Sequence, residues 1–170
     1  LRGVDPSLGP GMQSTGEVIG IHTDPRVALA KALLGASLVP PRPADGKAGA
    51  DRPLALLSIA DRDKVHLRRL ATGLSGAGYQ LAATPGTRAA LADAGYDARP
   101  VAKLGEAPDE TIGEVPILDM IASGEVRLVV NTPTPRSGAV RDASEIRLAA
   151  TAEGILCLTA METAVAAADA

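Results

Sequence analysis

The sequence predicts an α/β fold in which a parallel sheet of five strands is flanked by helices on both faces. From Leu54 onward, short apolar runs of strand length alternate with amphipathic segments of helix length. This alternation is typical of parallel strands joined by crossover helices. Several of the apolar runs end in polar turns at predicted helix starts. Polar groups are therefore expected at one edge of the sheet, which is where parallel sheets bind ligands.

Composition narrows the classes of protein to consider. The 170 residues are enough for one domain with a core. Lys and Arg number 17 and Asp and Glu number 20, basic residues never run longer than a pair, and Phe and Trp are absent. We therefore expect no nucleic-acid surface. No apolar stretch approaches the ~18 residues of a membrane span, and no signal peptide is visible.

The cysteine and histidine residues suggest neither a disulfide nor a metal site. Cys157 is the single cysteine and lies in an apolar run, so we expect a packing thiol in a reducing cytoplasm. His22 and His66 have no second histidine or cysteine at ligand spacing, so no metal site is expected.

The first third of the chain differs in character from the rest. Residues 1–20 are rich in glycine and proline and show no clean periodicity. Asp24-Pro25 predicts a helix start, with Gly35 as its end. Residues 40–53 form a Pro- and Gly-rich linker. We therefore expect three parts, residues 1–20, 21–53 and 54–170. A chain that begins with Leu1 is also expected to be a piece of something longer.

The next elements follow in order. Residues 54–60 predict a buried strand, after which Asp61 caps a helix whose apolar face carries Val65, Leu67, Leu70 and Leu74. Residues 79–83 predict the second strand, and the turn after it opens a second helix. The remaining strands are expected at 99–104, 127–131 and 155–158, and the remaining helices after Pro116, over 142–152 and after Thr159.

Two of these strand-to-helix turns predict an anion site. Helix starts carry partial positive charge and unpaired N–H groups. Lys64 adds a full charge, Thr84 and Thr87 add hydroxyl groups, and Gly86 lies in the same turn. These residues predict a phosphate cradle. Further polar residues at strand ends are expected on the same rim: Lys103, Asn131 and Thr159.

A series of motifs, spread in order over essentially the whole chain, resembles one protein family. They are Leu8-Gly9-Pro10 with Met12, Ser14-Thr15-Gly16-Glu17-Val18, Leu56-Leu57-Ser58-Ile59 with Asp63-Lys64, Ala83-Thr84-Pro85-Gly86-Thr87, Val101-Ala102-Lys103 and Asn131-Thr132. They are similar to the large subunit of carbamoyl-phosphate synthase. Residues 1–20 resemble the end of its second ATP-grasp unit. The rest resembles its C-terminal domain, which has the methylglyoxal-synthase-like, Rossmann-like three-layer fold.

The resemblance implies a cytoplasmic regulatory domain without catalytic residues or a cofactor of its own. It would bind a nucleotide effector and control carbamoyl phosphate formation for arginine and pyrimidine biosynthesis. In the enteric enzymes UMP inhibits and IMP activates. The partners implied are the rest of the large subunit, which uses ATP with Mg or Mn, and the glutaminase small subunit. The effector positions implied are Lys64, Thr84, Gly86, Thr87, Lys103, Asn131 and Thr132.

Two departures from the family pattern bear on ligand binding. Pro133 replaces a threonine, which removes a hydroxyl and an N–H from the phosphate loop and leaves Thr132 and Thr134 there. Leu158 replaces an aspartate that contacts ornithine in enteric members. An apolar side chain cannot pair with an ammonium group, so ornithine regulation at this rim is not expected.

Two enzymes of the same fold remain as alternatives. One is a methylglyoxal-synthase-type lyase acting on a triose phosphate, which needs an acidic base and a histidine. After Asn131 this chain has Thr-Pro-Thr-Pro-Arg-Ser-Gly instead of an Asp- and His-rich run, and the nearest acid, Asp142, has no histidine nearby in sequence. The other is the inosine-cyclising domain of the purine bifunctional enzyme, which lacks the ATP-grasp tail.

Overall fold

The computed structural model of the chain describes residues 19–35, 52–132 and 137–169, with the side chains of 137–141 left aside. The chain divides into two compact units between Val39 and Pro40, and each is described by itself. In the first unit, α1 (Pro25–Gly35) begins after Asp24, whose Oδ1 accepts the N–H of Arg26 at 2.9 Å. The predicted helix start is therefore present. Proline suits this first turn, where N–H groups lack intrahelical acceptors.

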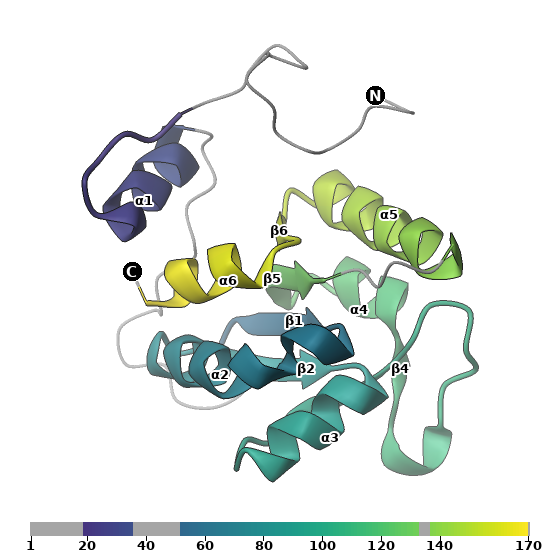
Figure 1. The fold of residues 1–170 in the computed structure, drawn as a ribbon. Helices are drawn as coiled ribbons and strands as arrows, with labels where there is room; N and C mark the ends of the chain where they lie inside the picture. Colours follow the sequence, from purple (N-terminus) through teal and green to yellow (C-terminus); the bar gives the residue numbers. More distant parts are fainter. Residues whose placement is uncertain (1–18, 36–51, 133–136, 170) are drawn as a thin grey trace. The chain divides into compact units, whose positions relative to one another are not determined.

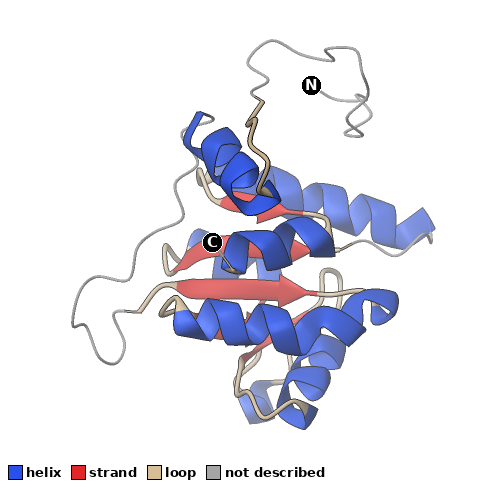
Figure 2. Ribbon diagram, turned by 60° about the vertical axis from the view of Figure 1, so that its left-hand side comes forward, coloured by secondary structure: helices blue, strands red, loops and turns tan. Residues whose placement is uncertain are grey.

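The second unit contains a sheet of six parallel strands in the order β4-β3-β2-β1-β5-β6 (Figures 1 and 2). The strands are β1 (Leu54–Ser58), β2 (Gln80–Ala83), β3 (Arg99–Ala102), β4 (Val115–Pro116), β5 (Val126–Asn131) and β6 (Leu156–Leu158). All five predicted strands are present. The sixth, β4, is a two-residue edge strand ending in proline, too short to give a sequence signal.

Helices cover both faces of this sheet, which confirms the predicted α/β fold. They are η1 (Asp61–His66), α2 (Leu67–Gly76), α3 (Pro85–Asp93), η2 (Glu110–Ile112), α4 (Ile117–Ala122), α5 (Ser137–Ala152) and α6 (Met161–Ala168), where η denotes a 3₁₀ helix. One core cluster joins α2, α3 and α6 to one face, and a second joins α4 and α5 to the other (Figure 1).

Strand β1 lies at the centre of this arrangement. Its alternate residues serve opposite cores: Ala55 and Leu57 pack in the first cluster, and Leu54 and Leu56 in the second. All four are fully buried. A parallel strand covered on both faces needs no polar alternation, which explains why this segment reads as a continuous apolar run.

Two details differ from the sequence expectations. The helix expected after β1 opens as the 3₁₀ helix η1, so the α-helical pattern starts only at Leu67 and Val65 is 78% exposed. Thr159 does not cap the last helix, because Ala160 takes the N-cap position. Cys157 packs beside the second core cluster as expected, and burial raises the pKa of its thiol.

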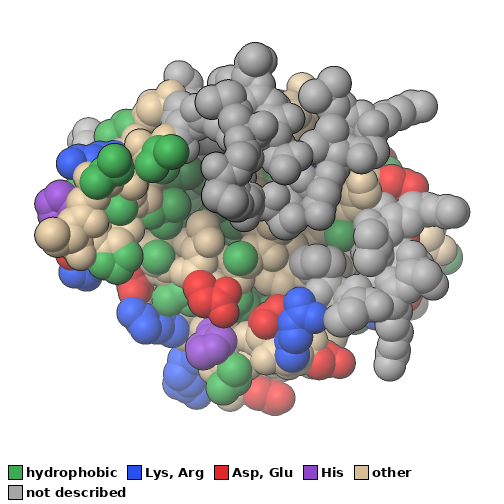
Figure 3. All heavy atoms as spheres, turned by 45° about the horizontal axis from the view of Figure 1, so that its top comes forward, with side chains coloured by type: hydrophobic (Ala, Val, Ile, Leu, Met, Phe, Trp, Pro, Cys, Tyr) green, Lys and Arg blue, Asp and Glu red, His purple; other side chains and the backbone are tan. Residues whose placement is uncertain are grey.

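The surface in Figure 3 shows acidic and basic side chains interspersed with apolar ones over the described residues of that face. Within the described ranges, no helix combines the length and the apolar character needed to cross a bilayer.

Helices α2 and α6 approach closely at a glycine. A Cβ added at Gly73 would lie 2.8 Å from both the Cβ and the carbonyl oxygen of Ala168. Real Cβ atoms do not come so close to such neighbours, so a larger residue at position 73 forces the two helices apart. At Gly76, on the same helix, an added Cβ would meet nothing within 4 Å.

We expect Gly73→Ala and Gly76→Ala to change stability in opposite directions. In Gly73→Ala, overpacking against Ala168 should lower the free energy of unfolding by about 1–3 kcal/mol. This loss exceeds the stability gained from the higher helix propensity of alanine. Gly76→Ala has only the entropic benefit and should raise it by about 0.4–1 kcal/mol. Urea denaturation of both variants measures this. Equal shifts would contradict the close packing of α2 on α6.

Candidate anion-binding site

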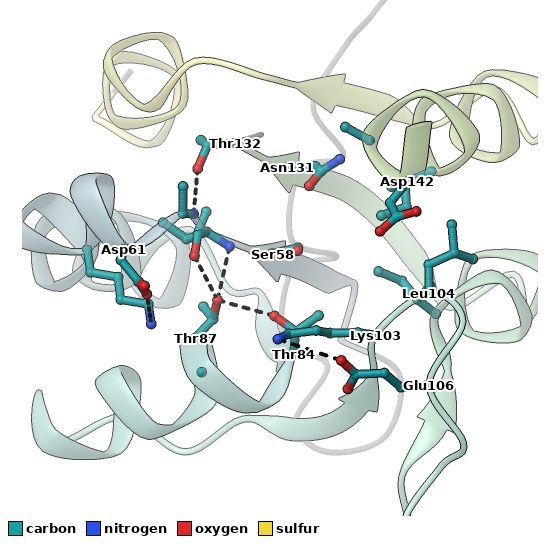
Figure 4. A pocket seen from close by; sticks show the side chains of 17 residues that line it. Ser58, Asp61, Thr84, Thr87, Lys103, Leu104, Glu106, Asn131, Thr132 and Asp142 are labelled. Atoms are coloured by element: carbon teal, nitrogen blue, oxygen red, sulfur yellow. Dashed lines mark hydrogen bonds and ion pairs between the residues drawn. The ribbon is translucent and has the colours of Figure 1, made fainter. Parts of the chain in front are cut away.

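A cavity of about 400 Å³ lies at the carboxyl ends of the central strands (Figure 4). The chain runs from β1 to β2 on one side and returns to β5 on the other, so the strand order reverses beside β1. Crevices at such reversal points are the usual ligand sites of parallel sheets. All seven predicted effector positions line this cavity: Lys64, Thr84, Gly86, Thr87, Lys103, Asn131 and Thr132. Thr159, expected on the same rim, is not among the lining residues.

Two buried threonines hold the chain as it leaves β1. The Thr87 hydroxyl accepts the N–H of Ile59 at 2.9 Å, and the Thr132 hydroxyl accepts the N–H of Ala60 at 2.8 Å. The N–H of Thr132 also donates to the carbonyl of Ser58 at 3.0 Å. These hydroxyls therefore satisfy buried backbone donors and fix the floor of the cavity. Two N–H groups that follow β1 are thus already engaged by the protein.

Thr84 joins β2 to the start of α3. Its N–H donates to the carbonyl of Leu57 at 3.2 Å, and its buried hydroxyl donates to the Thr87 hydroxyl at 3.3 Å. It occupies the N-cap position of α3, yet its side chain accepts no N–H of that helix. Pro85 follows without an N–H. Gly86 is then the first residue of α3 that carries an N–H, and in the first turn this N–H has no intrahelical acceptor.

Lys64 lies against this helix start. A Cβ added at Gly86 would be 3.2 Å from the Lys64 Nζ, so glycine lets the ammonium approach the backbone closely. The same Nζ lies 2.7 Å from Asp61 Oδ1. One full positive charge and the positive end of α3 therefore occupy one side of the cavity, and this combination favours an anion.

Lys103 supplies the second cation of the cavity. Its Nζ lies 3.9 Å from Glu106 Oε1, and both side chains are more than half exposed. The turn between them is closed by the N–H of Glu106 donating to the carbonyl of Lys103 at 3.1 Å. Lys103 is thus an exposed charge at the rim of the cavity, and its ion pair is longer and weaker than that of Lys64.

The opposite wall carries hydrogen-bonding groups of another kind. Asn131 is only 4% exposed, and its Nδ2 has no hydrogen-bond partner among the described residues. A buried amide donor without an acceptor costs about 1–3 kcal/mol, which a ligand acceptor in the cavity can recover. The half-buried Asp142 lies near Asn131 in Figure 4, on the side of the cavity away from Asp61.

Several lining residues were not among the predicted site positions. They are Ser58, Ile59, Ala60, Asp61, Leu104, Glu106, Ile117, Asp142, Ala143 and Ile146. Ile117 and Ile146 reach the cavity from α4 and α5, and only the fold brings those helices to this edge. Asp61 and Glu106 had a usable signal, because each lies three residues from a cavity lysine. Positions 133 and 134 lie outside the described residues.

The described ranges contain no group of three or more His, Cys, Asp or Glu side chains placed to hold a metal ion. Among the described residues, the charged lining instead consists of two lysines and three carboxylates, with apolar side chains between them. Such a cavity can accept a ligand that is anionic at one end and offers hydrogen-bonding groups at the other.

We expect Thr87→Val and Thr132→Val each to lower the free energy of unfolding by about 1–3 kcal/mol. Each change keeps the side-chain shape but leaves a buried N–H, of Ile59 or Ala60, without its acceptor. Thr151→Val is the matched control, because its exposed hydroxyl only donates to a carbonyl of its own helix. That control should stay within about 0.5 kcal/mol of the parent chain. Chemical denaturation separates the three, and a control as damaging as the other two would contradict the role of these hydroxyls.

The match to known families agrees with this geometry. The model of the MGS-like domain matches residues 66–159, which is more than half of the chain. The matched stretch contains every predicted site residue except Lys64, which lies just before it. It also contains β2 to β6 and most of the cavity lining. With this sheet and this match, the chain belongs to the family of MGS-like domains.

Proposed function

We propose that this chain is the allosteric regulatory domain of the large subunit of a glutamine-dependent carbamoyl-phosphate synthase, and that its cavity binds a nucleotide effector of the UMP or IMP type. The observation that carries the proposal is the polarity of the cavity. A lysine and a helix start lie on one side, and a buried amide and a carboxylate lie on the other. Its volume of about 400 Å³ is within the range of small-molecule sites.

The proposed ligand places its 5′-phosphate against Lys64 and the N–H of Gly86. A phosphate there gains charge-assisted hydrogen bonds and the favourable field of the helix start. Its ribose and base then extend toward Asn131, Asp142 and Lys103. Leu104, Ile117 and Ile146 supply apolar contact surface along that path.

The motifs of residues 1–20 support the larger assignment. In this proposal residues 1–20 end an ATP-grasp unit, residues 21–53 are a linker with one helix, and residues 54–170 are the regulatory domain. Its partners are the rest of the large subunit and the glutaminase small subunit, in the cytoplasm. ATP and its Mg or Mn act in the catalytic units and not in this cavity. A coupling free energy of ~1–3 kcal/mol between effector site and catalytic site is enough for regulation.

A methylglyoxal-synthase-type lyase is the alternative that the family match also accommodates. That reaction needs an acid and a histidine beside a triose phosphate. Asp61 and Asp142 line the cavity, but His66, the histidine of the same compact unit, is not among its lining residues. The lysine and amide groups serve binding in either case. The placement of His66 favours the regulatory proposal.

We expect Lys64→Ala to weaken UMP binding by about 1.5–3 kcal/mol, which is one to two decades in Kd. Uridine lacks the phosphate, so it should bind far more weakly than UMP to the parent chain and be unaffected by the substitution. Calorimetric titration of both ligands into both proteins gives the four values. Equal losses for UMP and uridine would mean that Lys64 contacts something other than phosphate.

Arg127→Ala is the matched control for this titration. It removes one positive charge at the start of β5, the edge of the sheet opposite the cavity, where the side chain is exposed. Loss of UMP affinity there would indicate a general effect of net charge. The same titrations with IMP and inosine test whether the cavity prefers a pyrimidine or a purine.

We expect no turnover of a triose phosphate by this chain, because the cavity offers acids without a histidine. Incubation of the purified protein with a triose phosphate, followed by a colorimetric assay for the dicarbonyl product, tests this. Activity above a blank that disappears in Asp142→Asn would overturn the regulatory proposal in favour of the lyase. Inosinate formation would point to the cyclising domain instead.

A further inference from the structure

Both lysines of the cavity are already paired with a carboxylate three residues away along the chain. Asp61 lies three residues before Lys64, and Glu106 lies three residues after Lys103. The two pairs differ in quality. The first has its charged atoms 2.7 Å apart, within hydrogen-bond distance, whereas the second spans 3.9 Å between exposed side chains.

The 3₁₀ form of η1 explains the tighter pair. With three residues per turn, side chains at i and i+3 lie directly above one another, so Asp61 stacks over Lys64. The carboxylate side chain is 93% exposed and the lysine 24% exposed. The pair is therefore a lysine held in the cavity wall with its counter-ion on the solvent side.

We propose that Asp61 is an intramolecular counter-ion that competes with the ligand's phosphate for Lys64 and so lowers the affinity of the cavity for phosphorylated ligands. Glu106 does the same at Lys103, more weakly. This inference rests on the proposed function and adds to it the residue that sets the effector concentration at which the domain responds.

The competition follows from tethering and charge. A carboxylate three residues away is present at a high effective concentration, which a ligand in solution must outcompete. If the carboxylate stays nearby, it repels the incoming phosphate instead. A phosphate dianion still prevails, because it also bonds the start of α3, where Gly86 leaves the backbone open. Affinity is then weaker than a bare lysine would give, and bound effector is released readily when its concentration falls.

The test measures Kd for UMP and for uridine with Asp61→Asn, Asp63→Asn and Glu106→Gln. Asp63→Asn is the matched control: it removes the same charge from the same 3₁₀ helix, but Asp63 pairs with Arg62 at 3.5 Å and does not line the cavity. Asp61→Asn should tighten UMP binding about three- to tenfold, the effect of a unit charge near 4 Å in a water-like medium. Glu106→Gln should give a smaller gain, and Asp63→Asn a gain below twofold.

Two further measurements isolate the mechanism. In a Lys64→Ala background, Asp61→Asn should tighten UMP binding less than it does in the parent background, because the competition needs the ammonium and only direct repulsion of the phosphate remains. The gain in the parent background should also shrink at 1 M salt, where the Debye length is about 3 Å. Thermal melts of each variant establish that the fold is kept.

The outcomes separate the inference from the proposed function. If Asp61→Asn weakens UMP binding, tightens uridine equally, or acts no more strongly than Asp63→Asn, the counter-ion role is wrong while the nucleotide site stands. If no protein, the parent chain included, prefers UMP over uridine, the proposed function is wrong and the inference with it.

Discussion

The fixed exit of the chain from β1 is the constraint on which the rest of the site depends. Ile59 and Ala60 leave the central strand with their N–H groups held by the hydroxyls of Thr87 and Thr132, one from each neighbouring strand-to-helix or strand-to-loop segment. Because both donors are engaged, one toward α3 and one toward the end of β5, the direction of the backbone is restrained before η1 begins. The position of Lys64 in the cavity wall follows from that direction. Thr87 and Thr132, which the sequence suggested as ligand contacts, thus also hold the backbone that positions Lys64.

Much of the fold could be predicted from sequence, because its signals are local. Continuous apolar runs such as 54–58 report burial on both faces, and the amphipathic Leu67, Leu70 and Leu74 report a helix lying on one of them. Two features have no local signal. Strand β4 is only two residues long, and the 3₁₀ geometry of η1 depends on tertiary constraints after β1. The exposure of Val65 follows directly from that second feature.

The lining residues that come from single strand-to-helix turns could be predicted from the sequence. Those that the topology brings in from distant helices could not. Thr84, Gly86 and Thr87 share one turn, and Lys64 follows the neighbouring strand, so sequence order alone brought them together. Ile117 and Ile146 come from helices on the far face of the sheet and gave only the ordinary signal of core residues. The carboxylates beside the lysines were visible as i,i+3 neighbours. The sequence did not predict that these carboxylates line the cavity, because the spacing between two residues does not tell which side of a turn faces a ligand.

The hydrogen bond between Ala60 and Thr132 spans 72 residues of chain, and β1 pairs with β5 over a similar interval. Contacts of such long sequence separation form slowly, because a large loop must close before they gain anything. During synthesis, β1 and β2 therefore emerge well before the strand that completes the cavity. Until Thr132 has been synthesised, β1 has no β5 to pair with and the N–H of Ala60 has no threonine acceptor. Assembly of the binding site and closure of the central sheet are then one event, so any ligand that selects the finished cavity also selects the finished fold.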